Sequence, residues 1–208
     1  MTSILTKIIT NVLQALYSPF VFATLFSFFA MFFYLFCKHP NEGGVNWKQA
    51  IFVWLKYFKK ERLFRKLTLL CFYGTMVLFR TLLNRNFGLN PLSEVMAGWW
   101  IYKTDLNTGE TILTTECIEN LILFIPFTAI LYWCCFEKIF PHSKKFRTIV
   151  WVSLKISLGL SLLIEFIQLF LRVGSFQFSD IFYNTLGGVI GGSLYWVLYK
   201  VEQWNKNC

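Results

Sequence analysis

The sequence predicts an all-α fold, a polytopic transmembrane helical bundle of about five spans. Of its 208 residues, 56% are hydrophobic and 20% aromatic, more than a soluble domain of this size can keep away from water. Several apolar stretches approach or exceed the ~20 residues that cross a bilayer. The net charge of +9 comes from residues beside these stretches, so it indicates membrane topology better than nucleic-acid binding.

The predicted spans cover about residues 12–37, 67–84, 118–136, 149–173 and 181–201. Pro19 lies near the start of the first span, where proline disturbs a helix least, and Pro126 predicts a kink in the third. No cleavage site follows the first apolar run, so we expect this span to be retained. The six cysteines are scattered without a C-x-x-C pair, which indicates packing residues and no metal site.

A separate amphipathic pattern lies between the first two spans. Trp47, Ala50, Ile51, Trp54, Leu55 and Phe58 recur at helical spacing, and Lys48, Gln49, Lys56, Lys59 and Lys60 fill most of the other face. The pattern fits a basic amphipathic interfacial helix with lysines toward anionic lipid, and equally an ordinary amphipathic helix packed on the protein. The chain therefore divides into 1–66, 67–201 and a tail at 202–208.

The loop charges predict the orientation in the plasma membrane. Eight Lys and Arg residues stand between the first two spans against Glu42 and Glu61. The connection between the third and fourth spans and the carboxyl tail are also basic. By contrast, the loop 85–117 carries Glu94, Asp105, Glu110 and Glu116 against two basic residues. Basic loops stay inside, so we expect the amino terminus outside and the carboxyl terminus in the cytoplasm.

Polar residues within the spans gather in the half expected to face outward. A charge at mid-bilayer costs about 2.5–3.5 kcal/mol on translocon scales, so such side chains must face the protein interior or a wet cavity. A structural salt-bridge network is the plainer interpretation, and a binding pocket is the one we prefer because polar groups add little to helix association. The candidate ligand-binding residues are Arg80, Asn120, Glu165, Gln168, Arg172, Asp180 and Asn184.

Two overlapping pairs of glycines follow this cluster on the fifth span. Gly187 with Gly191, and Gly188 with Gly192, form small-xxx-small spacings that let another helix backbone approach closely. We expect these glycines to serve helix packing.

Several motifs in this order resemble the VanZ-like family of membrane proteins. They are Arg80 followed by Asn90-Pro91-Leu92, then Asn120-Leu-Ile-Leu-Phe-Ile-Pro126, Ser161-Leu-Leu-Ile-Glu165-Phe-Ile-Gln168, Arg172, and Asp180-Ile-Phe-Tyr-Asn184-Thr-Leu-Gly187-Gly188. The resemblance runs from Arg80 to the end of the fifth span. Family members often carry further aspartates where Gln177 and Ser179 stand, which weakens any mechanism with paired loop carboxylates. Because the founding member is linked to teicoplanin resistance, the resemblance implies a cell-envelope role.

Three functions follow from these observations. The first is a non-enzymatic factor that binds a lipid-linked envelope precursor, a lipoglycopeptide or another amphiphile, with arginines on its acidic groups. The second is an intramembrane enzyme with Glu165 and Asp180 as acid and base on an envelope lipid or lipopeptide. A transporter ranks last, because no charge but Lys155 continues the path inward. We expect no cofactor and no nucleic-acid partner.

Overall fold

A computed structural model describes residues 2–40, 46–83, 85, 87, 90–104, 109, 111–141 and 143–207. Glu42, Asn84, Asp105 and Glu110, which entered the predictions of spans and orientation, lie outside the described residues. The chain is helical, with one short antiparallel hairpin, and the predicted all-α class is confirmed. Its elements are α1 (Thr2–Tyr17), α2 (Phe20–Lys38), α3 (Trp47–Lys60), α4 (Arg62–Leu78), the π-helical turn η2 (Phe79–Leu83), β1 (Tyr102–Thr104), β2 (Thr111–Leu113), α5 (Glu116–Ile139), α6 (Phe146–Leu171) and α7 (Phe178–Asn207).

Four helical stretches in the described part are long and apolar enough to cross a membrane: Ile4–Lys38, Arg62–Leu83, Glu116–Ile139 and Phe146–Leu171. The predicted fifth span is α7, whose 30 residues extend about 45 Å. Glycines and polar side chains make α7 less apolar than these four stretches. The prediction of about five spans fits this architecture.

The amino-terminal helix differs from the prediction. The first span was expected to begin near residue 12, but the chain forms a separate helix α1, then turns at Ser18 and Pro19 before α2 begins at Phe20. Proline has no N–H to donate to the preceding turn, so the helical hydrogen bonds break here. The 19 residues of α2 extend about 28 Å, close to the ~30 Å of the hydrocarbon layer.

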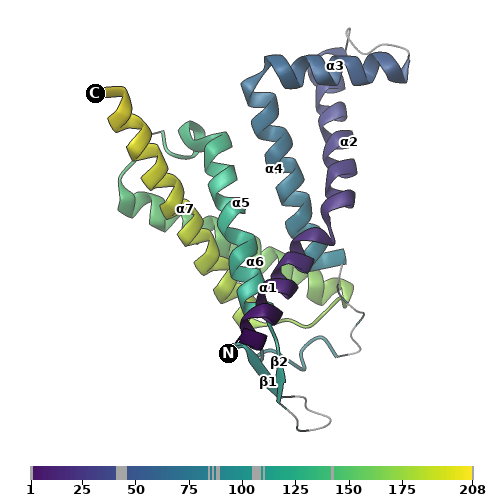
Figure 1. Ribbon diagram of the computed structural model, residues 1–208, viewed down its shortest axis with the longest axis vertical. Coiled ribbons are helices and arrows are strands. Elements are labelled where there is room, and N and C mark those ends of the chain that lie inside the picture. Colours follow the sequence, from purple (N-terminus) through teal and green to yellow (C-terminus); the bar gives the residue numbers. More distant parts are fainter. Residues whose placement is uncertain are drawn as a thin grey trace.

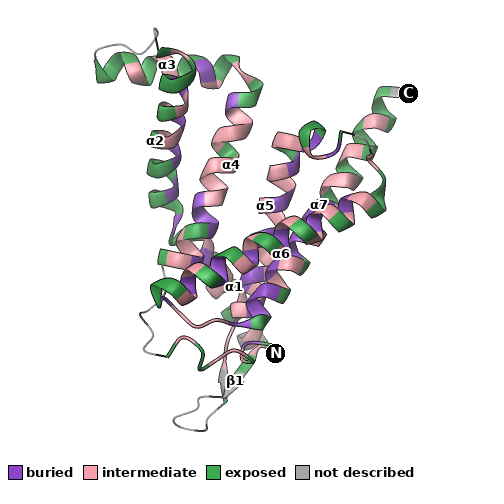
Figure 2. Cartoon of the chain, turned by 180° about the vertical axis from the view of Figure 1, so that it is seen from behind, coloured by how far each residue is buried: buried purple, intermediate pink, exposed green. Residues whose placement is uncertain are grey.

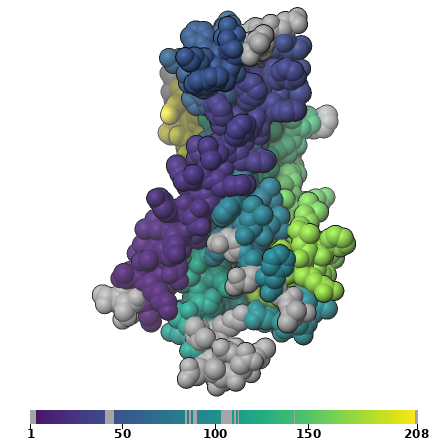
Figure 3. All heavy atoms as spheres, turned by 90° about the vertical axis from the view of Figure 1, so that its right-hand side faces the viewer, coloured from purple at the N-terminus to yellow at the C-terminus, as the bar shows by residue number. Residues whose placement is uncertain are grey.

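The two ends of the molecule differ in what they carry (Figure 1). The amino terminus and the β1–β2 hairpin lie at one end, which we call the hairpin end. Helix α3 and the carboxyl terminus lie toward the other, the α3 end, and Figure 3 shows α1 and α2 running along one face between the two. The basic segments of the sequence thus gather toward the α3 end. Which end faces the cytoplasm stays a prediction.

Helix α7 packs closely against both α5 and α6 because of its four glycines. A Cβ at Gly187 or Gly191 would lie 2.3 or 2.1 Å from a carbonyl oxygen of α5. A Cβ at Gly188 or Gly192 would lie 1.8 or 2.1 Å from a serine hydroxyl of α6. Buried residues concentrate where these three helices meet (Figure 2). The predicted packing role of the glycines is therefore confirmed.

The non-helical backbone angles of α5 lie at Cys135 (φ −122°, ψ 17°) and not at Pro126, where the kink was expected.

Helix α5 is tied to α4 toward the α3 end. The Lys66 ammonium of α4 donates a 2.7 Å hydrogen bond to the carbonyl oxygen of Trp133 and lies 4.9 Å from its ring centroid. This lysine therefore joins the helices α2–α4 to the helices α5–α7.

The close packing of α7 predicts that alanine lowers the free energy of unfolding at a packed glycine of α7 but not at an open glycine of α6. Gly191→Ala sets a methyl group against the backbone of Ile125, which cannot rotate away, so we expect a loss of about 1–3 kcal/mol in the free energy of unfolding. Gly159→Ala on α6 is the matched control, since nothing lies within 4 Å of its added Cβ. Denaturant unfolding in detergent micelles, followed by circular dichroism, measures both. Equal stability of the two variants would contradict the packing.

Candidate functional site

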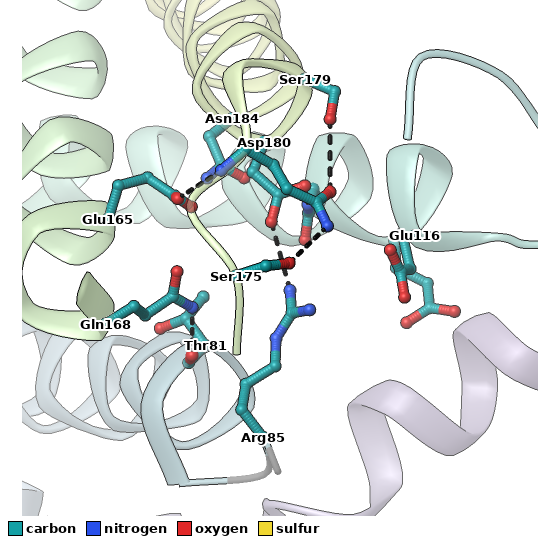
Figure 4. A network of polar contacts seen from close by, with 12 residues as sticks. Thr81, Arg85, Glu116, Glu165, Gln168, Ser175, Ser179, Asp180 and Asn184 are labelled. Atoms are coloured by element: carbon teal, nitrogen blue, oxygen red, sulfur yellow. Dashed lines mark hydrogen bonds and ion pairs between the residues drawn. The ribbon is translucent and has the colours of Figure 1, made fainter. Parts of the chain in front are cut away.

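Asp180 is the centre of the polar cluster at the hairpin end. Its side chain lies in the first turn of α7 and is only 6% exposed. One carboxylate oxygen accepts a 2.7 Å hydrogen bond from the amide of Asn120 on α5, and the other lies 3.2 Å from the Arg85 guanidinium (Figure 4). The buried charge of Asp180 is therefore neutralised by a residue that follows η2, and oriented by one from α5.

The polar face of α6 lines the same cluster. Glu165 is 1% exposed and accepts a 2.9 Å hydrogen bond from the backbone N–H of Gln177. One turn further along, Gln168 donates a 2.6 Å hydrogen bond to the carbonyl oxygen of Thr81 in η2. Glu165 thus holds the connection between α6 and α7, while Gln168 holds the end of α4 against α6.

Asn184 completes the cluster one turn beyond Asp180. Its amide donates a 2.9 Å hydrogen bond to the hydroxyl of Ser161 on α6. Five predicted residues are thus brought together by α5, α6 and α7, namely Asn120, Glu165, Gln168, Asp180 and Asn184.

Two loops close over the cluster through hydrogen bonds. The carboxylate of Glu94 accepts from the hydroxyl of Ser175 at 3.0 Å and from the side-chain amide of Gln177 at 3.1 Å. Ser179 donates to the carbonyl oxygen of Ala97 at 2.7 Å. Gln177 and Ser179, which stand where aspartates were expected, therefore join the α6–α7 connection and the first turn of α7 to the segment after η2.

Arg80 lies in a different polar pocket from Asp180. It forms an ion pair with Glu119, whose carboxylate also accepts a 2.6 Å hydrogen bond from Thr115. Thr115 in turn accepts a 2.9 Å hydrogen bond from Asn11 of α1. The pocket has a volume of about 340 Å³ and also borders Gln14, Ala15 and Ser18. The structure thus separates Arg80 from the cluster around Asp180, although the sequence grouped the two residues.

Arg172 lies outside the cluster. It follows the last residue of α6 in a left-handed conformation (φ 54°, ψ 38°), and its side chain is exposed. Within the described part of the chain, no ion pair or side-chain hydrogen bond holds it. The cation that joins the cluster in its place is Arg85, which the sequence suggested only as a loop charge.

Several buried polar atoms of the cluster have no hydrogen-bond partner among the described residues. They are the side-chain oxygens of Gln168 and Asn184, the Nε of Arg85 and one carboxylate oxygen of Glu116. Leaving such a group unpaired costs about 1–3 kcal/mol, so native proteins satisfy nearly all of them. These atoms offer both donors and acceptors to a bound water or ligand.

An apolar groove adjoins the cluster on the other face of α7. It has a volume of about 630 Å³, and Ile181, the residue after Asp180, forms part of its wall. Trp99 borders it and packs against Phe182 with ring centroids 5.7 Å apart. The remaining wall is almost wholly apolar and consists of Met96, Leu154, Leu158, Phe178, Thr185, Leu186 and Val189. The buried polar cluster and the apolar groove therefore lie on different faces of the first three turns of α7.

The comparisons with known proteins give one match. The VanZ/LLP1 family model matches residues 5–199, which is nearly the whole chain. No curated protein and no solved structure matches. The chain therefore belongs to the VanZ/LLP1 family. The match is wider than the motif resemblance and includes α2 and α3, which lie before Arg80.

The pairing of Arg85 with Asp180 predicts a large effect from a single substitution. Arg85→Gln leaves the carboxylate of Asp180 buried without its cation, which typically costs about 3–5 kcal/mol of stability. Adding Asp180→Asn to this variant should restore part of the loss, since the new amide oxygen still accepts from Asn120. Lys206→Gln breaks an exposed pair with Glu202 as the control and should change stability by less than about 1 kcal/mol. Unfolding midpoints that fall equally for Arg85→Gln and Lys206→Gln would refute this pairing.

Proposed function

We propose that this member of the VanZ/LLP1 family binds a lipid-linked or amphiphilic envelope ligand at the hairpin-end cluster and thereby contributes to resistance to teicoplanin-type antibiotics. Family membership links the chain to membrane proteins of glycopeptide resistance. The proposal includes the orientation expected from the loop charges, with the hairpin end outside and the carboxyl terminus in the cytoplasm of the cell. The ligand would then enter from the outer leaflet.

The single observation that supports this function best is that residues of the polar cluster alternate along α7 with residues of the apolar groove, Asp180 with Ile181 and Asn184 with Thr185. The cluster contains the Arg85 guanidinium, which suits a phosphate or carboxylate, and buried amide oxygens of Gln168 and Asn184 that have no partner among the described residues and can accept from hydroxyl or N–H groups. Beside it, the apolar groove suits an acyl chain. An amphiphile whose head occupies the cluster and whose tail lies along α7 satisfies both surfaces.

A structural network alone explains the cluster less well. Polar contacts between helices in membranes contribute only modestly, on average about 0.6 kcal/mol in measured cases. A network selected only to hold helices together would also pair its own members. Within the described part of the chain, Gln168 and Asn184 each keep a buried oxygen without a partner, although their amide nitrogens are satisfied.

A catalytic role remains the second candidate because two carboxylates are buried in the same cluster with different partners. Asp180 is paired with Arg85, whereas the hydrogen bond to Glu165 comes from a backbone N–H. Such different environments are how paired carboxyl groups divide into acid and base. In this version the protein would alter its ligand chemically, which mass spectrometry of the ligand after incubation detects directly.

Binding by purified protein in detergent micelles tests the proposal, with a lipoglycopeptide as the probe. Arg85→Gln should weaken binding about tenfold or more, because losing a hydrogen bond to a charged group costs about 1.5–3 kcal/mol. Arg85→Lys keeps the charge and the pair with Asp180 but loses the planar fork of donors, so it should weaken binding while the protein stays folded.

Arg172→Gln is the matched control, since it removes the same charge from an exposed position at the same end of the molecule. It should leave affinity unchanged. In cells that express equal amounts of each variant, the order of protection against the antibiotic should follow the order of affinity. Wild-type affinity in both Arg85 variants would exclude the cluster as the binding site.

A further inference from the structure

Helix α3 lies across the ends of α2 and α4 at the α3 end of the molecule (Figures 1 and 3). A helix that crosses the ends of spanning helices lies along the membrane surface when those helices span the bilayer. The position of α3 therefore sets it at the boundary between hydrocarbon and water, where amphipathic helices bind.

One face of α3 is fixed to the protein. Tyr57 is buried in a cluster with Met31 and Leu35 of α2 and Phe64 of α4. Val53, Trp54 and Phe58 pack against the same cluster. This face satisfies the expectation of an ordinary helix packed on the protein, and it fixes how α3 is rotated about its own axis.

A second set of large apolar side chains on α3 is exposed in the described part of the chain. Trp47 and Phe52 are each 70% exposed, and Ile51 and Leu55 are exposed as well. Trp47, Ile51 and Leu55 follow one another at intervals of four residues, so they form a stripe beside the packed face. Large side chains exposed in this way at the end of a spanning bundle are suited to burial among acyl chains, with tryptophan at headgroup depth.

The remaining surface of α3 is basic. Lys48, Lys56, Lys59 and Lys60 lie on it and are exposed. Glu61 is the one acidic residue between positions 46 and 62, and it is paired with Lys38 of α2 at 3.3 Å. The helix therefore presents an excess of positive charge next to its exposed apolar stripe, which is complementary to an anionic surface.

We propose that α3 is a binding surface for anionic lipid headgroups. Trp47, Ile51 and Leu55 insert among the acyl chains, and the lysines hold the lipid phosphates by charge. This inference concerns the opposite end of the molecule from the ligand cluster and does not depend on the proposed function.

Fluorescence quenching in nanodiscs tests this surface with the whole protein. The discs contain phosphatidylcholine and a fixed fraction of brominated lipid, either phosphatidylglycerol or phosphatidylcholine, and the difference between wild type and Trp47→Phe isolates the signal of Trp47. We expect brominated phosphatidylglycerol to quench Trp47 about twice as strongly as brominated phosphatidylcholine, because charge enriches it at α3. Molar salt should reduce this preference through screening.

Charge variants separate α3 from the rest of the basic surface. Lys56→Gln with Lys59→Gln should abolish the preference at Trp47, whereas Lys200→Gln with Lys206→Gln removes the same charge from α7 and should leave it intact. Equal quenching by the two lipids in the wild type would overturn the proposal. So would a Trp47 that neither lipid quenches, since the stripe would then face water and be open to a protein partner.

Discussion

The closeness of α7 to its two neighbours is the constraint on which the rest of the structure depends. Four glycines remove the side chains that would hold α7 away from the α5 backbone and from the serines of α6. The same helix carries Asp180 about two turns and Asn184 about one turn before these glycines, so close packing brings both within hydrogen-bond distance of α5 and α6. The polar cluster therefore exists because the glycines beside it allow the helices to touch.

The charges are then divided between two sites by a change in helical geometry. Arg80 lies within the π-helical turn η2 and Arg85 follows it, and the two arginines serve separate carboxylates. On α5, the adjacent residues Glu119 and Asn120 likewise belong to different sites. Insertions of this kind recur where helices carry function. As a result, the two buried carboxylates that form ion pairs have separate cations: Glu119 pairs with Arg80, and Asp180 pairs with Arg85.

The sequence alone predicted most of the cluster, because burying charge in a bilayer leaves few places for Glu165, Asp180 and their amide neighbours. It could not assign the cations. Arg172 lies at the expected position along the chain, but α6 ends at Leu171 and the backbone at Arg172 is left-handed. Its side chain is exposed and lies outside the cluster. Arg85 falls beyond η2, and a regular helical repeat cannot locate a residue after a π-helical turn. Glu119 lies at the start of the predicted third span and went unnoticed, because only its partners Arg80 and Thr115 mark it as part of a polar site.

The rod formed by α4 and η2 has a consequence for the molecule as a whole. It extends from Arg62 to Leu83, with α3 seated at one end and the hydrogen bond from Gln168 at the other. Gln168 of the polar cluster and the packed face of α3 thus contact opposite ends of one helical rod. If the ligand proposed for the cluster shifts η2 and the shift reaches α3, linkage requires that lipid bound at α3 change the affinity for that ligand by the same factor.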